Sequence, residues 1–273
     1  MRRIYFVKYN DWSSTILGAD QIAEALRARG YEAWSVSPDE VRDVRDAILV
    51  FIKTSHWWHL ERARWRRNLT VLDVQDTVAL KDRIKNPSLF DGMIWRSRRQ
   101  LQDFGRAKQT NRVIPLQWDP RYLPNRIDGE RFAIGYFGIA RSFQHWGQIE
   151  GLPCYDRDYF RHAPDYNCHI SVHPPGRNRL YKPGTKVSTA AACAANLITA
   201  RDPSAIELLG DEYPYFLDSC ELPGTLAGIE YARATFGGPK WRAGLERMRE
   251  VRERTSIARV TDAYLDYFAE LSR

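Results

Sequence analysis

Two lysines stand at the start of a short helix that is rich in alanine. Lys182 is followed by Pro183 and Gly184, which end the preceding element, and Thr185 can cap the helix that Lys186 opens. Free backbone N–H groups at a helix N-terminus, together with two ammonium groups, attract an anion. The alternative is an ordinary packing helix with two solvated lysines.

The elements around these lysines predict half of a parallel sheet. Small residues continue the helix through 190–195, and Asn196 can end it in a left-handed conformation. A short buried strand over 197–199 follows, and Asp202 can cap a second helix that runs to Leu209. Another strand is expected over 213–217. Helix, strand, helix and strand with short loops are typical of a parallel α/β sheet.

The first 116 residues show a similar alternation of strands and helices. It predicts a doubly wound parallel sheet, but the GxGxxG pattern of dinucleotide-binding domains is absent. The expected strands are 4–9, 31–36, 47–53, 70–74, 92–95 and 112–116, with helices over 14–29, in the basic stretch after His59, after Asp76 and over 98–104.

A polar stretch with two prolines, residues 117–125, is the expected linker. A strand over 132–139 then starts the second half of the chain, and a further strand is expected over 167–172, directly before His173. We therefore expect an N-terminal Rossmann-like domain over 1–125 and a C-terminal one over 126–273. Apolar residues at helical spacing predict a long amphipathic segment from Trp241 to Leu271.

The order of motifs over residues 132–218 resembles the donor-binding core of GT-B glycosyltransferases. The motifs are Lys-Pro-x-x-Lys from Lys182, the small-residue helix, the Leu-Ile-Thr strand and then Ile-Glu-Leu-Leu-Gly. The resemblance implies two Rossmann-like domains with a nucleotide-sugar between them, a glycine-bearing loop at 138–142 beneath the phosphates, and a C-terminal helix that crosses back to the first domain. It also implies transfer of a sugar to a glycan or glycolipid without a bound metal or other cofactor.

The resemblance, with the rule that ligands bind at the carboxyl ends of parallel strands, selects the donor-side residues. Many retaining GT-B enzymes carry two glutamates eight positions apart around this helix, and Tyr181 and Thr189 stand at those positions. A solvated or capping role is an equal alternative for Glu207. The expected donor-binding residues are Arg141, His173, Lys182, Thr185, Lys186, Ser188, Thr189 and Glu207, and the rule also selects Arg177 and Arg179.

An inverting transfer needs a base on a loop of the first domain. His56 follows the most apolar strand and Asp11 follows the first strand, so both are candidates, against the alternative of polar loop residues or caps. Asp76 and Asp119 lie at similar places. Trp57 and Trp58, beside His56, can stack on an acceptor sugar or pack in the core.

The composition fits a soluble globular protein and limits the partners. Lys and Arg number 41 against 34 Asp and Glu, a formal net charge of +7, with arginines clustered at 62–67 and 96–99. Phosphorylated substrates, an anionic membrane surface and nucleic acid are possible partners, and nucleic acid ranks last because no nucleic-acid motif accompanies the clusters. The four cysteines lack ligand-like spacing, so no metal site is expected.

The start of the chain runs directly into a strand pattern, and no stretch is long and apolar enough to span a membrane. We therefore expect a cytoplasmic protein. Two other interpretations stay open: an inactive GT-B-like binding or assembly protein, because the glutamate pair is missing, and another enzyme on a Rossmann-like pair, such as a sugar-nucleotide epimerase.

Overall fold

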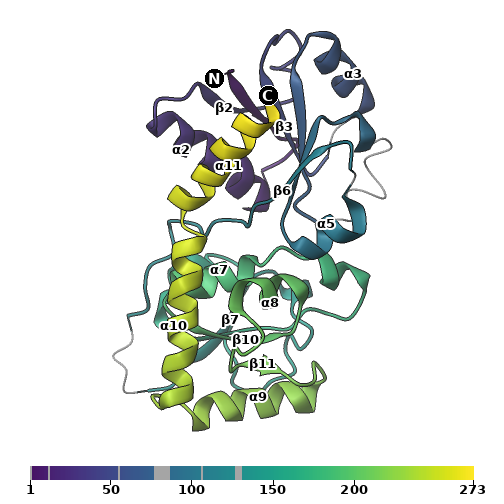
Figure 1. The fold of residues 1–273 in the computed structure, drawn as a ribbon. Helices are drawn as coiled ribbons and strands as arrows, with labels where there is room; N and C mark the ends of the chain where they lie inside the picture. The colour runs from purple at the N-terminus through teal and green to yellow at the C-terminus, as the bar shows by residue number, and fades with distance from the viewer. Residues whose placement is uncertain (1, 12, 55, 77–86, 106, 127–130) are drawn as a thin grey trace. The chain divides into compact units, whose positions relative to one another are not determined.

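The computed structural model (Figure 1) describes residues 2–11, 13–54, 56–76, 87–105, 107–126 and 131–273. The chain divides into two compact units. Unit 1 comprises Met1–Gln117, Tyr181–Pro183 and Ser256–Arg273, and unit 2 comprises Trp118–Leu180 and Gly184–Thr255. The chain thus leaves unit 1 directly after Gln117, within the expected linker stretch.

Unit 1 contains a six-stranded parallel sheet in the order β2-β1-β3-β4-β5-β6. Its central strands are buried on both faces, which is why they read as continuous apolar runs. The strands are β1 (Ile4–Val7), β2 (Ala33–Val36), β3 (Ile48–Ile52), β4 (Leu69–Asp73), β5 (Gly92–Trp95) and β6 (Thr110–Val113).

The first helix of unit 1 contains a π-helical stretch. α1 (Ser13–Thr15) leads into the π-helix Ile16–Gln21 and then α2 (Ile22–Ala28), and Gly30 follows with a φ of 84°. π-helical turns are rare and occur frequently at functional sites. The other helices are α3 (Trp57–Trp65), α5 (Arg98–Phe104) and the 3-10 turn Pro87–Leu89. The helix expected after Asp76 lies outside the described residues.

Unit 2 contains a five-stranded parallel sheet in the order β11-β10-β9-β7-β8. Its strands are β7 (Ile134–Phe137), β8 (Cys154–Tyr155), β9 (Cys168–Ser171), β10 (Asn196–Ala200) and β11 (Phe216–Leu217). The expected strand over 213–217 is therefore confined to its last two residues. Tyr213 instead donates its hydroxyl hydrogen to Asn196 Oδ1 at 3.4 Å and accepts from Leu197 N at 2.8 Å.

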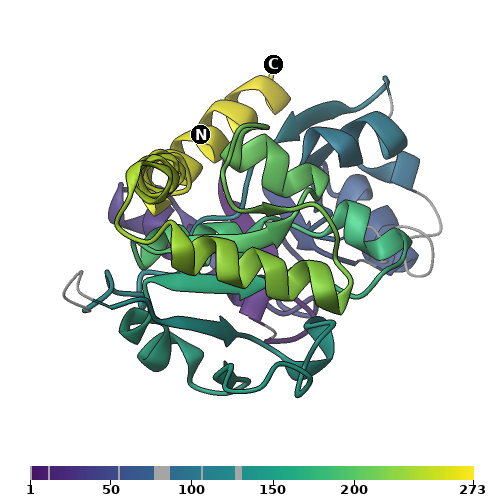
Figure 2. The same ribbon diagram turned by 90° about the horizontal axis from the view of Figure 1, so that it is seen from below.

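Helices cover this sheet, with α9 crossing the foreground of Figure 2 in light green. Val187, Ala190 and Ala191 of α7 pack in the same core as Ile198 of the sheet and Met248 of α10. The helices are α6 (Tyr159–His162), α7 (Thr185–Ala192), α8 (Pro203–Leu209), α9 (Leu222–Ala234) and α10 (Pro239–Arg254), with 3-10 turns at Ala140–Ser142, Ala163–Asp165 and Arg177–Tyr181.

The C-terminal segment consists of two helices rather than one. α10 ends at Arg254, and α11 (Ile257–Leu271) begins after Ser256, whose hydroxyl accepts from Arg259 N at 3.4 Å. α11 packs in the core of unit 1, where the Tyr267 hydroxyl donates to Thr110 O at 3.0 Å. The expectation that the last helix returns to the first domain is thereby confirmed.

Three expected caps differ from the structure. The left-handed residue after α7 is Ala194, with a φ of 51°, because Ala195 N bonds back to Ala190 O and places the turn two residues earlier than Asn196. Gly184, not Thr185, is the N-cap of α7. Asp202 occupies the N-cap position of α8, but its side chain pairs with Arg179 instead of capping.

Candidate functional site

Each sheet has one place where neighbouring strands send their following loops in opposite directions. In unit 2 it lies between β7 and β9, and in unit 1 between β1 and β3. In open α/β sheets, ligands bind outside the carboxyl ends of the strands at such a switch point. In unit 2 this place brings together the loop after Phe137, the segment after Ser171 and the start of α7.

Lys186 occupies the switch point of unit 2. Its ammonium donates to Phe137 O and lies 5.0 Å from the centre of the Tyr136 ring and 6.0 Å from that of Tyr159. Burial of the ammonium lowers the pKa of Lys186 to about 8, because desolvation disfavours the charged form. Lys186 thus places a positive charge at the carboxyl end of β7, and an anion arriving there would stabilise that charge.

Gly138 leaves room for this lysine. Its φ is 148°, in the region that favours glycine, and a Cβ at this position would collide with Lys186 Nζ. Tyr136 fixes the same loop by donating its hydroxyl hydrogen to Ile139 O at 2.9 Å. The glycine of the expected phosphate loop therefore has a steric reason that the sequence alone did not reveal.

The other expected donor residues on α7 differ in how they are placed. Thr185 is the first helical residue and is partly buried. Ser188 is buried, and its hydroxyl donates to Gly184 O at 3.4 Å. Thr189 is buried and forms a hydrogen bond with Tyr122. Of these three, Thr185 stands nearest the free N–H groups of the helix start.

His173 joins the two loops of the switch point. Its Nδ1 lies 3.0 Å from Ser142 O. A carbonyl only accepts, so Nδ1 carries the proton and a neutral ring keeps Nε2 as an acceptor. Arg141, on the same loop as Ser142, is exposed. The structure thus brings Arg141 and His173 close to the loop that Lys186 supports.

Lys182 and Lys186 belong to different units, because Tyr181–Pro183 groups with unit 1 and Gly184–Thr255 with unit 2. Tyr181 donates to Asp103 Oδ2 at 2.8 Å, and its carbonyl accepts from Gln100 Nε2 at 2.8 Å. Phe104 packs edge-on against the Tyr181 ring at 5.0 Å. Of the two lysines, only Lys186 belongs to unit 2.

Glu207 and the Arg179–Asp202 pair lie around α8. Glu207 is partly buried on that helix, and its backbone carbonyl accepts from Arg254 Nη2 at 3.2 Å. Burial raises the pKa of Asp202, while Arg179 opposes that shift. Arg179 is therefore held by a carboxylate at the carboxyl end of β10. Arg177 belongs to the 3-10 turn that carries Arg179.

The two candidate bases both lie at the switch point of unit 1. Asp11 follows β1 and pairs with Lys8 at 2.7 Å, with most of its side chain exposed. His56 follows β3, and its backbone N–H donates to the Tyr9 hydroxyl at 3.2 Å. That hydroxyl also lies 2.9 Å from His59 Nδ1, and burial raises the pKa of Tyr9 to about 12. The sequence did not single out Tyr9 or His59, although both directly flank the candidates.

The two remaining carboxylates have cationic partners. Asp76 lies 3.8 Å from the ammonium of Lys53, which follows β3 and is buried with a φ of 65°. Asp119 is buried and accepts from the Arg121 guanidinium at 2.6 Å. Asp119 belongs to unit 2, so it does not join the candidates of unit 1.

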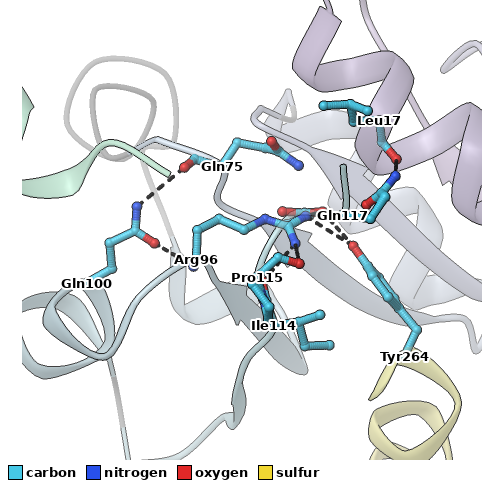
Figure 3. Close-up of polar contacts among 9 residues, drawn as sticks. Leu17, Gln75, Arg96, Gln100, Ile114, Pro115, Gln117 and Tyr264 are labelled. Atoms are coloured by element: carbon cyan, nitrogen blue, oxygen red, sulfur yellow. Dashed lines mark hydrogen bonds and ion pairs between the residues drawn. The ribbon is translucent and has the colours of Figure 1, made fainter. Parts of the chain in front are cut away.

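A buried polar network supports the carboxyl ends of β4 and β5 (Figure 3). Arg96 pairs with Asp73. Tyr264 of α11 contacts both residues, because its hydroxyl oxygen lies 3.1 Å from Arg96 Nη2 and 2.9 Å from Asp73 Oδ2. Gln100 accepts from Arg96 N at 2.6 Å and donates to Gln75 O at 3.3 Å. This network was not predicted from the sequence, although Arg96 stands directly after a buried strand.

Gln117 ties the π-helix to this region at the point where the chain leaves unit 1. Its Nε2 donates to Leu17 O at 2.6 Å (Figure 3) and lies 3.1 Å from Gln21 Oε1. A π-helical turn frees backbone carbonyls from the regular ladder, and this side chain satisfies one of them.

The arginine cluster on α3 is largely paired. Asp43 accepts from Arg66 at 2.7 Å and from Arg62 at 3.3 Å, and Asp46 pairs with Arg67 at 2.8 Å. Such exposed pairs add little stability, but they reduce the positive field of the surface. No described helix is long and apolar enough to cross a membrane, and no described group of His, Cys, Asp and Glu residues has the arrangement of a metal site.

Two Rossmann-like parallel sheets, with a last helix that returns to the first, define the GT-B fold. The chain has this fold. HepE from Anabaena, solved with UDP and glucose, superposes with a TM-score of 0.71 at 11% identity, covering 99% of this chain and all of HepE. Sucrose-phosphate synthase from Thermosynechococcus elongatus gives 0.68 at 10% identity, with 99% of each chain covered.

A third structure, the glycosyltransferase AviGT4 of avilamycin A biosynthesis, gives a TM-score of 0.67 at 12% identity, covering 99% of this chain and 98% of AviGT4. Neither a protein-family model nor a curated protein sequence matches the chain. The fold therefore rests on three-dimensional likeness and not on shared sequence.

Proposed function

We propose that the protein is a glycosyltransferase that moves a sugar from a nucleoside diphosphate donor to a glycan or lipid-linked acceptor. The observation that carries this proposal is the Lys186 ammonium, which is held under Gly138 at the switch point of unit 2. In a nucleotide-sugar the bond from the anomeric carbon to the diphosphate breaks, and the leaving diphosphate gains negative charge. A positioned cation stabilises that charge.

Three features of unit 2 supply positive charge or hydrogen-bond donors for the diphosphate. Lys186 contributes its ammonium, the start of α7 contributes backbone N–H groups beginning near Thr185, and Arg141 extends from the neighbouring loop. Protein cations take the role that a metal ion fills in other transferases, so the proposed reaction is metal-independent. We assign donor binding to residues 126–273 and acceptor binding to 1–125.

Unit 1 supplies the base in this scheme. The acceptor hydroxyl oxygen bonds to the anomeric carbon, and its proton passes to the base. His56 and Asp11 are the candidates, since both lie at the switch point between β1 and β3. The Asp11 carboxylate pairs with Lys8 at 2.7 Å, whereas His56 offers an imidazole nitrogen as the acceptor of the proton.

A lipid-linked acceptor would bring a cytoplasmic protein to the inner face of a membrane as a peripheral partner. The arginine pairs with Asp43 and Asp46 make attraction by charge alone weak on the α3 side. We therefore assign recognition of the acceptor to its glycan part, and nucleic acid is not among the proposed partners.

One observation favours a second function, an inactive GT-B-like binding or assembly protein. The two positions where many retaining GT-B enzymes carry glutamates are committed to other contacts. Tyr181 binds Asp103, and Thr189 binds Tyr122 in a buried position. The ribose of a bound nucleotide would need a different partner, and an inactive protein would lack that partner.

Thermal-shift measurements with UDP, GDP, CMP and ADP test both functions. UDP comes first, because HepE was solved with UDP-glucose. We expect one nucleotide to stabilise the protein, and we expect Lys186→Ala to weaken its binding by about 1–3 kcal/mol. Hydrolysis or transfer of the matching sugar donor then separates an enzyme from a binder. If no nucleotide stabilises the folded protein, the proposed transferase function is refuted.

Lys182→Ala provides the comparison with Lys186→Ala. If both lysines contact the phosphate, each variant should lose a similar amount of nucleotide affinity. A loss confined to Lys186→Ala would restrict the phosphate contact to the lysine of unit 2.

A further inference from the structure

The helix α3 presents two exposed tryptophans on one face. Trp58 and Trp65 are 50% and 79% exposed, the two largest exposed aromatic surfaces among the described residues. They are seven residues apart, which is two helical turns and roughly 10 Å along the axis. Glu61 and Arg62 lie between them on the same face, because positions three and four apart are neighbours.

The opposite face of α3 packs in the hydrophobic core of unit 1. Leu60 and Ala63 are buried in the core beside β3 and β4, together with Phe51 and Leu72. Packing therefore does not require the tryptophans, and an indole that stays exposed costs hydrophobic free energy. An exposed aromatic surface of this kind marks a binding site more often than a random position.

The stripe formed by Trp58, Glu61, Arg62 and Trp65 is continuous with the acceptor-side loop of unit 1. The Trp58 indole stacks on the His56 ring, with centroids 4.6 Å apart and an interplanar angle of 6°. His56 in turn packs edge-on against Tyr9 at 5.3 Å. A ligand that lies along the stripe therefore ends beside a candidate base.

The charge of the stripe limits what it can bind. Within the stripe Glu61 balances Arg62, and Arg62 also pairs with Asp43, so the stripe has no net positive charge to attract a phosphate backbone or an anionic membrane. A membrane-binding helix would also carry large aliphatic residues beside its tryptophans, whereas Glu61 and Arg62 occupy those positions. Flat aromatic faces separated by charged hydrogen-bonding groups suit the apolar faces and hydroxyls of sugar rings.

We propose that the α3 stripe binds an extended, uncharged or weakly charged glycan, and that this glycan is the acceptor, an assignment that rests on the proposed transferase function. Trp65 holds a ring remote from the reaction, and Trp58 holds a ring next to His56. The acceptor is then an oligosaccharide chain of more than one sugar and not a small monosaccharide.

The test measures glycan binding on an array of neutral and uronic-acid oligosaccharides, followed by titration of the best-bound oligosaccharide. We expect binding by the full chain, and a loss of about three- to tenfold in Trp65→Ala with retention in Trp65→Phe. Trp65 is mostly exposed, so its removal leaves the fold intact. Tyr231→Ala, a 43% exposed aromatic of unit 2, is the matched control and should bind normally.

Three results would overturn the inference: no binding to any array glycan, binding that Trp65→Ala leaves unchanged, or Trp65-dependent binding to phosphatidylglycerol vesicles without glycan binding. UDP stabilisation, measured on the same samples, keeps the two proposals apart. UDP binding without glycan binding would reject glycan binding by the stripe and leave the transferase proposal standing. Trp65-dependent glycan binding without any nucleotide binding would support glycan binding by the stripe and reject both the transferase function and the assignment of the glycan as its acceptor.

Discussion

In unit 2 the Lys186 ammonium occupies the space that a side chain at Gly138 would fill. A Cβ at position 138 would collide with the lysine ammonium, which donates to the carbonyl of Phe137, and the φ of Gly138 is 148°, in the region that favours glycine. Buried ammonium groups are costly unless they are partnered. The Phe137 carbonyl partners the ammonium and holds it in a fixed place, and its contact with a donor phosphate stays a prediction.

Substituting Gly138 should damage ligand binding more than folding. Gly138→Ala displaces the Lys186 ammonium, and we expect weaker UDP binding by isothermal titration calorimetry, by about 1–3 kcal/mol. Gly147→Ala is the matched control, because Gly147 also has a positive φ, 72°, but no atom lies near its Cβ position. Equal loss of UDP affinity in both variants would contradict the steric argument.

Nucleotide affinity should fall as the pH rises through about 8. Burial lowers the pKa of Lys186 to about 8, so the ammonium that attracts a diphosphate is lost above that value. Titrations at several pH values from 6.5 to 9.5 measure this loss, and Lys186→Arg, which stays charged, should show a flatter profile. Since both proteins meet the same nucleotide, the ligand's own titration cancels in the comparison. Identical profiles would rule out Lys186 as the titrating group.

The same shift has the opposite effect on folding. The folded pKa of Lys186 lies below its unfolded value, so the unfolded chain binds more protons between about pH 8 and the ordinary lysine pKa. The contribution of Lys186 to the free energy of unfolding should therefore become more favourable as the pH rises through that window. Urea denaturation of wild type and Lys186→Met checks it: a difference that does not change with pH would argue against a depressed pKa.

Tyr264 should stabilise unit 1 more than its neighbour Tyr267 does. The Tyr264 hydroxyl touches both Asp73 and Arg96, whereas the Tyr267 hydroxyl bonds a single backbone carbonyl, that of Thr110. We expect Tyr264→Phe to lower the free energy of unfolding by about 1–3 kcal/mol, because it leaves a buried carboxylate short of a donor. Urea unfolding of Tyr264→Phe and Tyr267→Phe makes the comparison, and a larger loss in Tyr267→Phe would be inconsistent with it.

His56 should affect the chemical step and not donor binding. If it is the base, His56→Gln should lower kcat by about 10²–10⁴-fold while UDP affinity stays unchanged. His59→Gln is the control, since His59 contacts the same Tyr9 hydroxyl from the next helical turn. Asp11→Asn tests the other candidate in the same transfer assay. Normal kcat in both His56→Gln and Asp11→Asn would place the base elsewhere.

Local patterns in the sequence were enough to predict the strands of unit 1 and most strands of unit 2, although the two-residue strand β8 was not predicted. Buried parallel strands produce continuous apolar runs, and glycine, proline and capping residues mark their ends, so the strand beginning at Ile48 and the helix Arg98–Phe104 were predicted close to their observed bounds. The same alternation placed His56 and His173 directly after strands, which is where a switch point needs them. The grouping of functional residues by the two domains stays a prediction.

Contacts between residues far apart in sequence were decided only by the tertiary structure. Arg96 and Tyr264 are separated by 168 positions, and no local pattern shows that α11 supplies the hydroxyl beside a buried guanidinium. Asp43 and Asp46 offset part of the charge that the arginine run suggested, and Tyr122 forms a hydrogen bond with Thr189. Propensity and periodicity report each residue's own backbone and burial, whereas partners depend on how distant segments pack.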